Sequence, residues 1–408
     1  MSGAVRSLVS RAAGVRMVDP AAVGERPETT VLVLDGDYDN AVHVATELKQ
    51  DLDVTVVGAG TSGHSRLLRS RYCDLGVTVP PPGSDGYGTA IRDLVRAVRP
   101  DAVVPVGYDS TAAVVTSREE LPEGTACALP DPDAFAVARD KRRTLALGAD
   151  LGIPVPRDHT QAVRAADRAG RPADALDGVD FPLFLKASVE TGRADTAVVT
   201  APGEFWERYD WLHRASGTDV LVQEYVDGNA HTYACGLLLV DGAVELLASH
   251  EETRSVPRRG GSGTRLRLFR QPRLEALSIQ LLQELDWTGV ALVEFTRRRD
   301  GTYVLMEINP KFWASYALAS QCGYRFASTM VARALDKTPV PRGRPEQYGE
   351  RVFPLRELAH WYEHRSEESL AECLGAMLWP PAHPDLNLTD PAAALTAPAE
   401  PGGDDGDR

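Results

Sequence analysis

The fold is decided by residues 290–309, VALVEFTRRRDGTYVLMEIN. Two strongly apolar runs in this stretch are separated by a polar segment that contains Asp300 and Gly301. An Asp-Gly pair between apolar runs is the preferred two-residue turn of a β-hairpin. Counting back from that turn along both strands places Glu294 directly opposite Glu307. The two carboxylates are therefore expected to share one face of a sheet.

These two carboxylates predict a metal site. Directly opposed side chains in a hairpin have Cβ atoms about 4.5–5.5 Å apart, so two like charges are unfavourable there unless a cation lies between them. Asn309 lies two residues beyond Glu307 and projects from the same face, which adds an amide oxygen. Oxygen ligands of this kind suit magnesium better than zinc. The alternative, a solvated acidic hairpin, is disfavoured because both glutamates interrupt strongly apolar strands.

The residues before the hairpin predict a parallel α/β domain followed by a small second lobe. Apolar runs at 30–34, 54–57 and 102–106 alternate with helical patterns, which indicates a parallel sheet with helices on both faces. Short strand patterns at 181–186 and 197–200 bracket a glycine-containing turn. We expect this turn to be a movable flap.

A larger sheet is expected next, because strand patterns recur between residues 220 and 308. The end of the chain is rich in Pro, Ala, Asp and Gly, which is typical of disorder. The expected division is a loose N-terminal extension (1–28), a parallel α/β domain (29–130), a connecting helix with a small lobe (131–220), a large lobe (221–340), a C-terminal extension (341–390) and a disordered tail (391–408).

Composition excludes several classes of protein. The chain has 408 residues, of which 43% are hydrophobic, enough for two or three lobes of ordinary size. Its net charge of −14 disfavours a broad nucleic-acid surface, which needs clustered Lys and Arg. The five cysteines are scattered without a close pair, and no secretory signal or membrane span is evident. We therefore expect a cytoplasmic protein without a nucleic-acid or membrane partner.

Glu294 followed by Glu307-Ile308-Asn309 resembles the metal-binding pattern of the ATP-grasp superfamily, in which a glutamate on one strand and Glu-x-Asn on the next bind the magnesium ions of ATP. The resemblance covers residues 29–340 and is strongest to the carboxylate-amine ligase and carbamoyl-phosphate-synthase-like branch. It implies an α/β protein with the ATP-grasp fold: an N-terminal parallel domain, a small flap lobe and a large mixed-sheet lobe. It also implies ATP and two Mg²⁺ ions, for which Mn²⁺ can substitute.

The resemblance assigns further residues to ATP. Lys141 and Lys186 match the two lysines that reach the phosphates. Thr191 and Gly192 occupy the position of the phosphate-covering glycine loop, although this loop has fewer glycines than is usual. The remaining matches are Glu224, Tyr225 and Val226, which lie along the adenine and read its edge through backbone groups, and His231, which contacts the ribose.

Three basic residues are matched to the substrate and the transferred phosphoryl group. Arg267 and Arg254 flank a glycine-rich stretch that resembles the substrate-reaching loop of this branch, and its alternative interpretation is an exposed linker. Lys311 stands where the family commonly has arginine, so the charge is kept but the bidentate fork is lost. The strand end at residues 35–39 is expected to help hold the acceptor.

The activity that the resemblance implies is ATP-dependent joining of a small-molecule carboxylate to an amine, with an amino acid as one substrate. The carboxylate becomes an acyl phosphate, an amide forms, and ADP and phosphate are released. A homodimer is a further expectation of the family. One alternative is a bicarbonate-activating carboxylase or carbamoyl-phosphate-forming enzyme, and another is a non-catalytic nucleotide-binding regulator.

Overall fold

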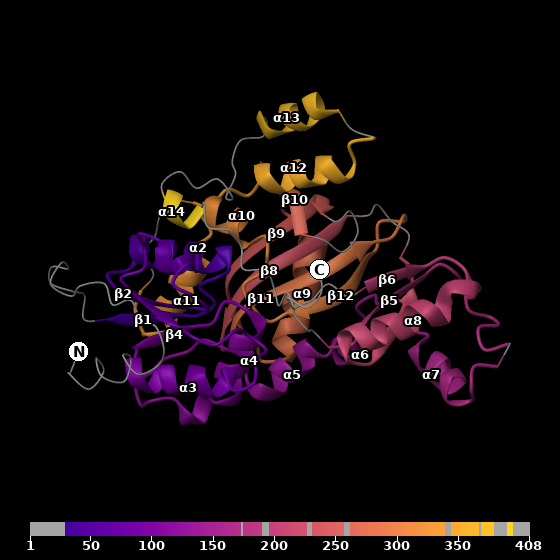
Figure 1. The fold of residues 1–408 in the computed structure, drawn as a ribbon, viewed down its shortest axis with the longest axis horizontal. Helices are drawn as coiled ribbons and strands as arrows, with labels where there is room; N and C mark the ends of the chain where they lie inside the picture. Colours follow the sequence, from indigo (N-terminus) through magenta and orange to yellow (C-terminus); the bar gives the residue numbers. More distant parts are fainter. Residues whose placement is uncertain are drawn as a thin grey trace, which may run out of the picture.

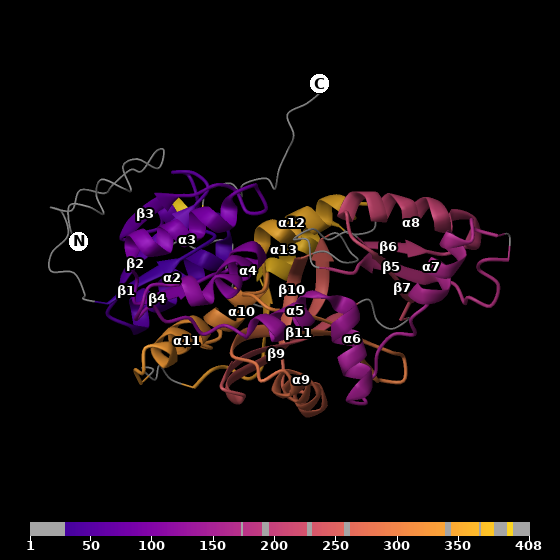
Figure 2. The ribbon, with the colours of Figure 1, turned by 90° about the horizontal axis from the view of Figure 1, so that it is seen from below.

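The structure is a computed structural model that describes residues 29–172, 174–189, 196–226, 231–256, 262–338, 344–366, 369–378 and 390–394. The expected N-terminal extension, most of the tail, and the loop residues Thr191 and Gly192 lie outside the described residues. The N-terminal domain and the small lobe occupy opposite ends of the molecule, and the large sheet lies between them (Figure 1, Figure 2).

The N-terminal domain is built on a parallel sheet with strand order β3-β2-β1-β4, as the alternating pattern predicted. Its strands are apolar and buried, and helices cover the sheet. The strands are β1 (Thr30–Val33), β2 (Thr55–Gly60), β3 (Leu75–Thr78) and β4 (Ala102–Val104). The helices are α2 (Asp39–Asp51), α3 (Tyr87–Val98) and α4 (Tyr108–Thr116), with short 3₁₀ turns at Leu67–Arg69 and Arg118–Glu120.

The small lobe is an antiparallel sheet of order β6-β5-β7, packed against two helices. Its strands are β5 (Leu183–Ala187), β6 (Thr196–Val199) and β7 (Val220–Glu224), and its helices are α7 (Thr160–Arg168) and α8 (Pro202–Ser216). Two helices lead into it, α5 (Pro132–Arg139) and α6 (Lys141–Asp150). The lobe has its own hydrophobic core, in which Phe205 and Leu185 are fully buried.

The large sheet has the order β12-β11-β8-β9-β10-β13 and is antiparallel in each pairing. Its strands are β8 (Thr232–Val240), β9 (Ala243–Val256), β10 (Ser262–Leu268), β11 (Gly289–Arg297), β12 (Tyr303–Asn309) and β13 (Gly349–Val352). Because β13 pairs with β10, this sheet extends beyond residue 340, where the large lobe was expected to end. The remaining helices are α9 (Pro272–Glu284), α10 (Tyr316–Gln321), α11 (Phe326–Ala334), α12 (Pro354–Glu363), α13 (Leu370–Leu378) and α14 (Pro391–Ala394).

The N-terminal domain and the large lobe share one hydrophobic core. It joins apolar side chains of α2 to the aromatic cluster that follows β12. Two polar contacts cross the same boundary: the Tyr316 hydroxyl donates to the buried Glu47 at 2.6 Å, and the Asn40 amide donates to the Trp313 carbonyl at 2.8 Å. These two parts therefore form one base, whereas the small lobe, with its separate core, is the part best suited to move.

One close approach inside this base gives a stability prediction. Trp313 covers Gly236 of β8, and a Cβ at position 236 would lie 2.4–2.5 Å from the indole ring. Gly236→Ala therefore forces the buried ring to shift, and we expect it to cost about 1–3 kcal/mol in unfolding free energy, measured by urea titration. Gly203→Ala is the control, because nothing lies within 4 Å of its added methyl. Equal stability of the two variants would contradict the packing described here.

Candidate ATP and metal site

The turn of the β11–β12 hairpin differs from the expected one. The Arg298 N–H donates to the Thr302 carbonyl at 2.9 Å, so three residues rather than two form the loop. Gly301 ends this loop with a φ of 90°, a left-handed conformation that glycine adopts without strain. Taken alone, the longer loop would shift the strand pairing by one residue.

A bulge in β12 restores the predicted carboxylate pair. Phe295 pairs with Leu305, whereas the neighbouring Glu294 pairs with Glu307, so Met306 is an extra residue in β12. Bulges of this kind re-aim side chains beside functional sites. Glu294 and Glu307 are therefore cross-strand partners, as predicted. The pairing arises from a three-residue loop and a bulge, and not from the two-residue turn that was expected.

Asn309 joins the two carboxylates at one point on the sheet. Its amide nitrogen donates to Glu294 at 2.8 Å and to Glu307 at 3.2 Å. A half-turn of the amide would present its oxygen to the same point, and the two orientations are distinguished only through their hydrogen bonds. Two carboxylates and an amide oxygen on one face fit a magnesium ion that is also bound by phosphates and water.

Two lysines from other segments converge on this point. Lys141, the first residue of α6, lies with its Nζ 3.3 Å from Glu307. Lys186 of β5 donates from its Nζ to the carbonyl of Met306, the bulge residue, at 3.0 Å. The Lys141 N–H also bonds to the Ser188 carbonyl at 2.8 Å, which ties the start of α6 to the end of β5. Both predicted phosphate-binding lysines thus lie beside the predicted metal ligands.

Burial sets the protonation of this cluster. It lowers the pKa of Lys186 to about 8, although Glu307 and Glu294 oppose the shift. Burial alone would raise the pKa of Glu307, but the charges of Lys141 and Lys186 outweigh it and hold that pKa below its ordinary value. At neutral pH an ionised Glu307 therefore lies close to a mostly protonated Lys186, and the phosphates of a nucleotide together with a divalent cation would change this charge balance.

The segment after β7 fits the predicted position along a purine base. The Glu224 N–H bonds to the Arg157 carbonyl and the Tyr225 N–H to the Pro182 carbonyl, at 2.9 and 3.1 Å. Among the described residues, no hydrogen bond uses the N–H of Val226. The Glu224 side chain forms an ion pair with Arg298 near the hairpin turn. The Glu224 N–H is therefore occupied within the protein, whereas the Val226 N–H has no partner among the described residues.

His231 and Arg267 come together through Glu251. The His231 Nδ1 lies 2.6 Å from the Glu251 carboxylate, which also forms an ion pair with Arg267. Arg267 pairs with Glu251, Glu251 with Tyr233, and Tyr233 with Phe295 across four neighbouring strands. Phe295 follows Glu294 on β11, and successive side chains point to opposite faces of a sheet. The side chains of Glu251 and Arg267 therefore project from the face opposite to that of Glu294.

Arg254 and Lys311 have separate surroundings. Arg254 forms an ion pair with Glu357, a fully buried residue of α12. Lys311 forms no ion pair among the described residues and lies two residues beyond Asn309, the last residue of β12. Of the stretch from Arg254 to Arg267, which was interpreted as a loop, residues 254–256 belong to β9 and residues 262–267 to β10, and the part between them lies outside the described residues.

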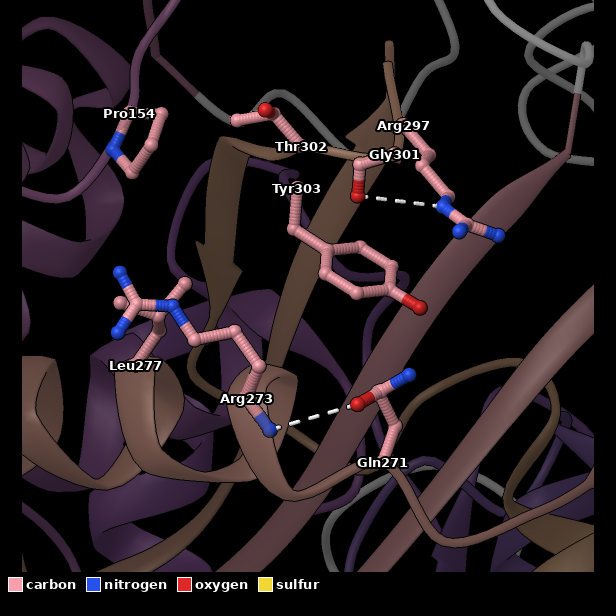
Figure 3. Close-up of a pocket in the computed structure, with 8 residues that line it drawn as sticks. All are labelled: Pro154, Gln271, Arg273, Leu277, Arg297, Gly301, Thr302 and Tyr303. Carbon is pink, nitrogen blue, oxygen red and sulfur yellow. Dashed lines mark hydrogen bonds between the residues drawn. The ribbon is translucent and has the colours of Figure 1, made fainter. Parts of the chain in front are cut away.

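A cavity of about 300 Å³ lies at the hairpin turn (Figure 3). It is lined by Pro154, Gln271, Arg273, Leu277, Arg297, Gly301, Thr302 and Tyr303. Tyr303 and Leu277 belong to the hydrophobic core on the α9 side of the sheet, whereas Glu294 faces the other side. The convergence of charged side chains, rather than this cavity, marks the candidate site.

Sequence reasoning missed three polar residues on the sheet face of the metal ligands. His250 belongs to the same row as Glu294, since both pair with Ala234. Glu252 follows two residues later on β9, and Ser315 contacts His250 at 2.9 Å. The available signal was the run Ser-His-Glu-Glu-Thr within a strand pattern that otherwise reads as apolar.

The fold is the ATP-grasp fold. No protein-family model matches the chain. A probable alpha-L-glutamate ligase of Saccharophagus degradans is 26% identical over 257 residues, which cover 60% of this chain and 79% of that protein.

Solved structures show the same fold. A biotin carboxylase from Campylobacter jejuni in complex with an ATP analogue has a TM-score of 0.64 and 14% identity, covering 79% of this chain and 74% of that one. The L-amino acid ligase from Bacillus licheniformis has a TM-score of 0.55 and 16% identity, covering 79% and 78%. At these identities the structures establish the fold alone.

Proposed function

We propose that this protein is an ATP-dependent carboxylate-amine ligase that forms an amide through an acyl phosphate. The observation that carries the proposal is the convergence of Glu294, Glu307 and Asn309 of the large lobe with Lys141 and Lys186 beside the small lobe. Adenine binding alone does not require this arrangement. Oxygen ligands next to two lysines are what transfer of a phosphoryl group requires.

The chain's own residues bind and orient the reactants. The carboxylate oxygen of the acid attacks the γ-phosphorus, the bond to the bridging oxygen breaks, and ADP leaves with that electron pair. Lys186 and Lys141 neutralise charge on the phosphates, and we assign Arg254 and Lys311 to the substrate and the transferred group. Arg267 projects from the other face of the sheet, so we no longer assign it to the transferred group. The two glutamates and Asn309 would hold Mg²⁺, which would supply further charge neutralisation.

The small lobe would close over the nucleotide. It has its own core, and its strand β5 reaches the large lobe through Lys186 and the Met306 carbonyl. The Glu224–Arg298 ion pair makes a second contact between the two lobes. Closure excludes water, which matters because an acyl phosphate is hydrolysed when exposed. Thr191 and Gly192 are assigned to the loop that covers the phosphates.

The names of related proteins favour a ligase over the two alternatives. The curated relatives include probable alpha-L-glutamate ligases, and one structural neighbour is an L-amino acid ligase. Biotin carboxylases are also structural neighbours, so bicarbonate has to be tested directly. A purely regulatory nucleotide-binding protein would not need both metal-binding carboxylates.

The test is ADP release from Mg-ATP with pools of amino acids, with other small acids and amines, and with bicarbonate. We expect ADP only when an acid and an amine are both present, and mass spectrometry of that mixture should show an amide. ADP that depends on bicarbonate alone would overturn the ligase in favour of a carboxylase. ATP binding without turnover under every condition would favour the regulator.

Three finer expectations accompany this function. The site would take two Mg²⁺ ions with ATP, with Mn²⁺ as a substitute, and the protein would act in the cytoplasm. No described helix is long and apolar enough to cross a membrane. We also propose a homodimer, because the C-terminal helices expose large apolar side chains, namely Leu355, Leu358, Tyr362, Leu370, Leu374 and Leu378. Light scattering of the intact protein tests this, and a monomeric mass would exclude it.

A further inference from the structure

A buried polar cluster lies beside the candidate metal site and takes no part in the chemistry assigned so far. His250 and Glu252 project from β9 on the same sheet face as Glu294. Their side chains are 3% and 15% exposed, and the His250 Nε2 lies 4.0 Å from the Glu252 carboxylate. Burial of a histidine and a carboxylate is costly unless polar partners compensate for it.

Ser315 bridges the histidine and the carboxylate. Its hydroxyl lies 2.9 Å from the His250 Nε2 and also forms a hydrogen bond with Glu252. Ser315 lies in the segment that directly continues β12 beyond Asn309, so the residues that hold the metal also place this hydroxyl. Because only Ala234 separates Glu294 from His250 along the row, the two are roughly 10 Å apart, a span that an acyl phosphate can fill.

The surrounding chain makes room for Glu252 and gives it a charged partner. A Cβ at Gly263 of β10 would lie 2.9 Å from the Glu252 carboxyl carbon, so glycine leaves the space that this carboxylate occupies. Arg356 of α12 interacts electrostatically with Glu252 and also with Asp39 at the start of α2. The cluster therefore lies where the N-terminal domain, the large sheet and the C-terminal helix α12 meet.

The expected strand end at residues 35–39 contributes to this junction through one residue. The Asp35 carboxylate accepts from the backbone of Val106 and Gly107, and the Asp37 carboxylate accepts from Thr61. Both are thus occupied within the N-terminal domain. Asp39 also pairs within this domain, with Arg66 at 3.1 Å, but it interacts electrostatically with Arg356 of α12 as well.

We propose that His250, Glu252 and Ser315 bind the acceptor amine, and that Glu252 accepts the proton of its ammonium group. This inference rests on the proposed ligase function. It restricts the acceptor to an amine that is protonated, and so positively charged, at neutral pH before it reacts. The proton moves from the ammonium to the Glu252 carboxylate, and the nitrogen lone pair attacks the acyl carbon. The C–N bond forms, the bond from carbon to the phosphate oxygen breaks, and phosphate leaves with that electron pair and the remaining N–H proton.

The protonation of the cluster suits this role. Burial raises the pKa of Glu252 to about 7, although the Ser315 hydroxyl and the Arg356 guanidinium oppose the shift. Burial lowers the pKa of His250 to about 4, so the histidine is neutral near pH 7 and does not compete for the proton. A general base is most effective when its pKa lies near the working pH.

The experiment compares two acceptors for the same acyl phosphate. Hydroxylamine is largely unprotonated at neutral pH and needs no base, whereas an alkyl amine does. For Glu252→Gln we expect kcat/KM for the amine to fall about 10²-fold at pH 7, while ATP-dependent hydroxamate formation changes less than about twofold. Glu245→Gln, on the same strand in a surface pair with Arg333, is the control and should leave both rates unchanged.

The pH profile separates a base from a merely structural residue. In the wild type, kcat/KM for the amine should rise with pH and level off above about 7, where Glu252 is ionised. In Glu252→Gln it should keep rising toward the pKa of the amine itself. Ser315→Ala removes a hydrogen bond that lowers the pKa of Glu252, so its plateau should begin at higher pH.

Other outcomes would overturn the inference. If hydroxamate formation and amine ligation fall equally in Glu252→Gln, or if neither falls, Glu252 is not the amine's base and the inference is overturned. An unshifted plateau in Ser315→Ala overturns it as well, even if Glu252→Gln proves too unstable to assay. If the wild type forms neither hydroxamate nor amide with any acid, the ligase function fails first and the amine site fails with it.

Discussion

Glu307→Gln is expected to lower kcat by about 10³-fold, which corresponds to roughly 4 kcal/mol of transition-state stabilisation. The glutamine keeps the size of the side chain and removes the charge that pairs with Lys141 at 3.3 Å. It also removes one of the two carboxylates that converge on Asn309. Steady-state ADP release at saturating acid, amine and ATP measures the effect, and raising the Mg²⁺ concentration should restore only part of it.

Glu307→Gln should not weaken nucleotide binding, although it lowers turnover. Without Glu307, one negative charge fewer faces the phosphates, so ATP titrated calorimetrically in EDTA should bind the variant at least as tightly as the wild type. Glu245→Gln serves again as the control, since the same substitution in a surface ion pair should change neither quantity. Turnover by Glu307→Gln within tenfold of the wild type would show that this carboxylate does not hold the metal.

The pairing of the candidate metal ligands could be predicted from the sequence, because side chains alternate between the two faces of a strand with a period of two residues. Glu294 and Glu307 interrupt apolar runs at positions that a hairpin brings together, and the structure pairs them. The predicted turn was wrong, however, since three residues form it, and the Met306 bulge compensates for the difference. A bulge depends on packing on both sides of a strand, so no local pattern revealed this one.

Strand β10 shows a second limit of reading the sequence. Its glycines and arginines are typical of a loop, yet Gly263 is in a strand because Glu252 on β9 occupies the space that a side chain would take. Likewise β13 follows a stretch with weak periodicity and is fixed by pairing with β10. In both places contacts between distant segments outweigh local propensity.

Residues whose environment comes from several parts of the chain were the hardest to predict. His250 and Glu252 become a site only when Ser315 and Arg356, which lie more than sixty positions away in the chain, are brought against them. Lys141 and Lys186 were assigned by resemblance, and the structure places both beside Glu307 or its neighbour Met306. Spacing along the sequence carries no information of this kind.

Lys186→Met should lower kcat/KM for ATP by about 10–100-fold, because a buried charge-assisted contact with a phosphate contributes about 1.5–3 kcal/mol. Methionine is also unbranched and only one atom shorter, and it removes the charge and the donor to the Met306 carbonyl. The measurement is the initial rate as a function of ATP concentration at pH 7, where a group with a pKa of about 8 is mostly protonated. Lys337→Met, at an exposed position, is the matched control.

The free energy of unfolding of Lys186→Met should not fall when its activity falls. A stability measurement therefore distinguishes loss of function from loss of fold. Burial lowers the pKa of Lys186 from 10.5 to about 8, so the folded state disfavours the charge and the wild type should gain stability as pH rises from 8 to 10.5. Lys186→Met lacks this titration, and its free energy of unfolding should be flatter with pH and no lower at pH 7. A variant that unfolds more easily at pH 7 and keeps its affinity for ATP would mean that Lys186 holds the lobes together rather than binding phosphate. Loss of ATP affinity with stability retained would mean that the protein keeps a costly buried cation for the sake of the nucleotide.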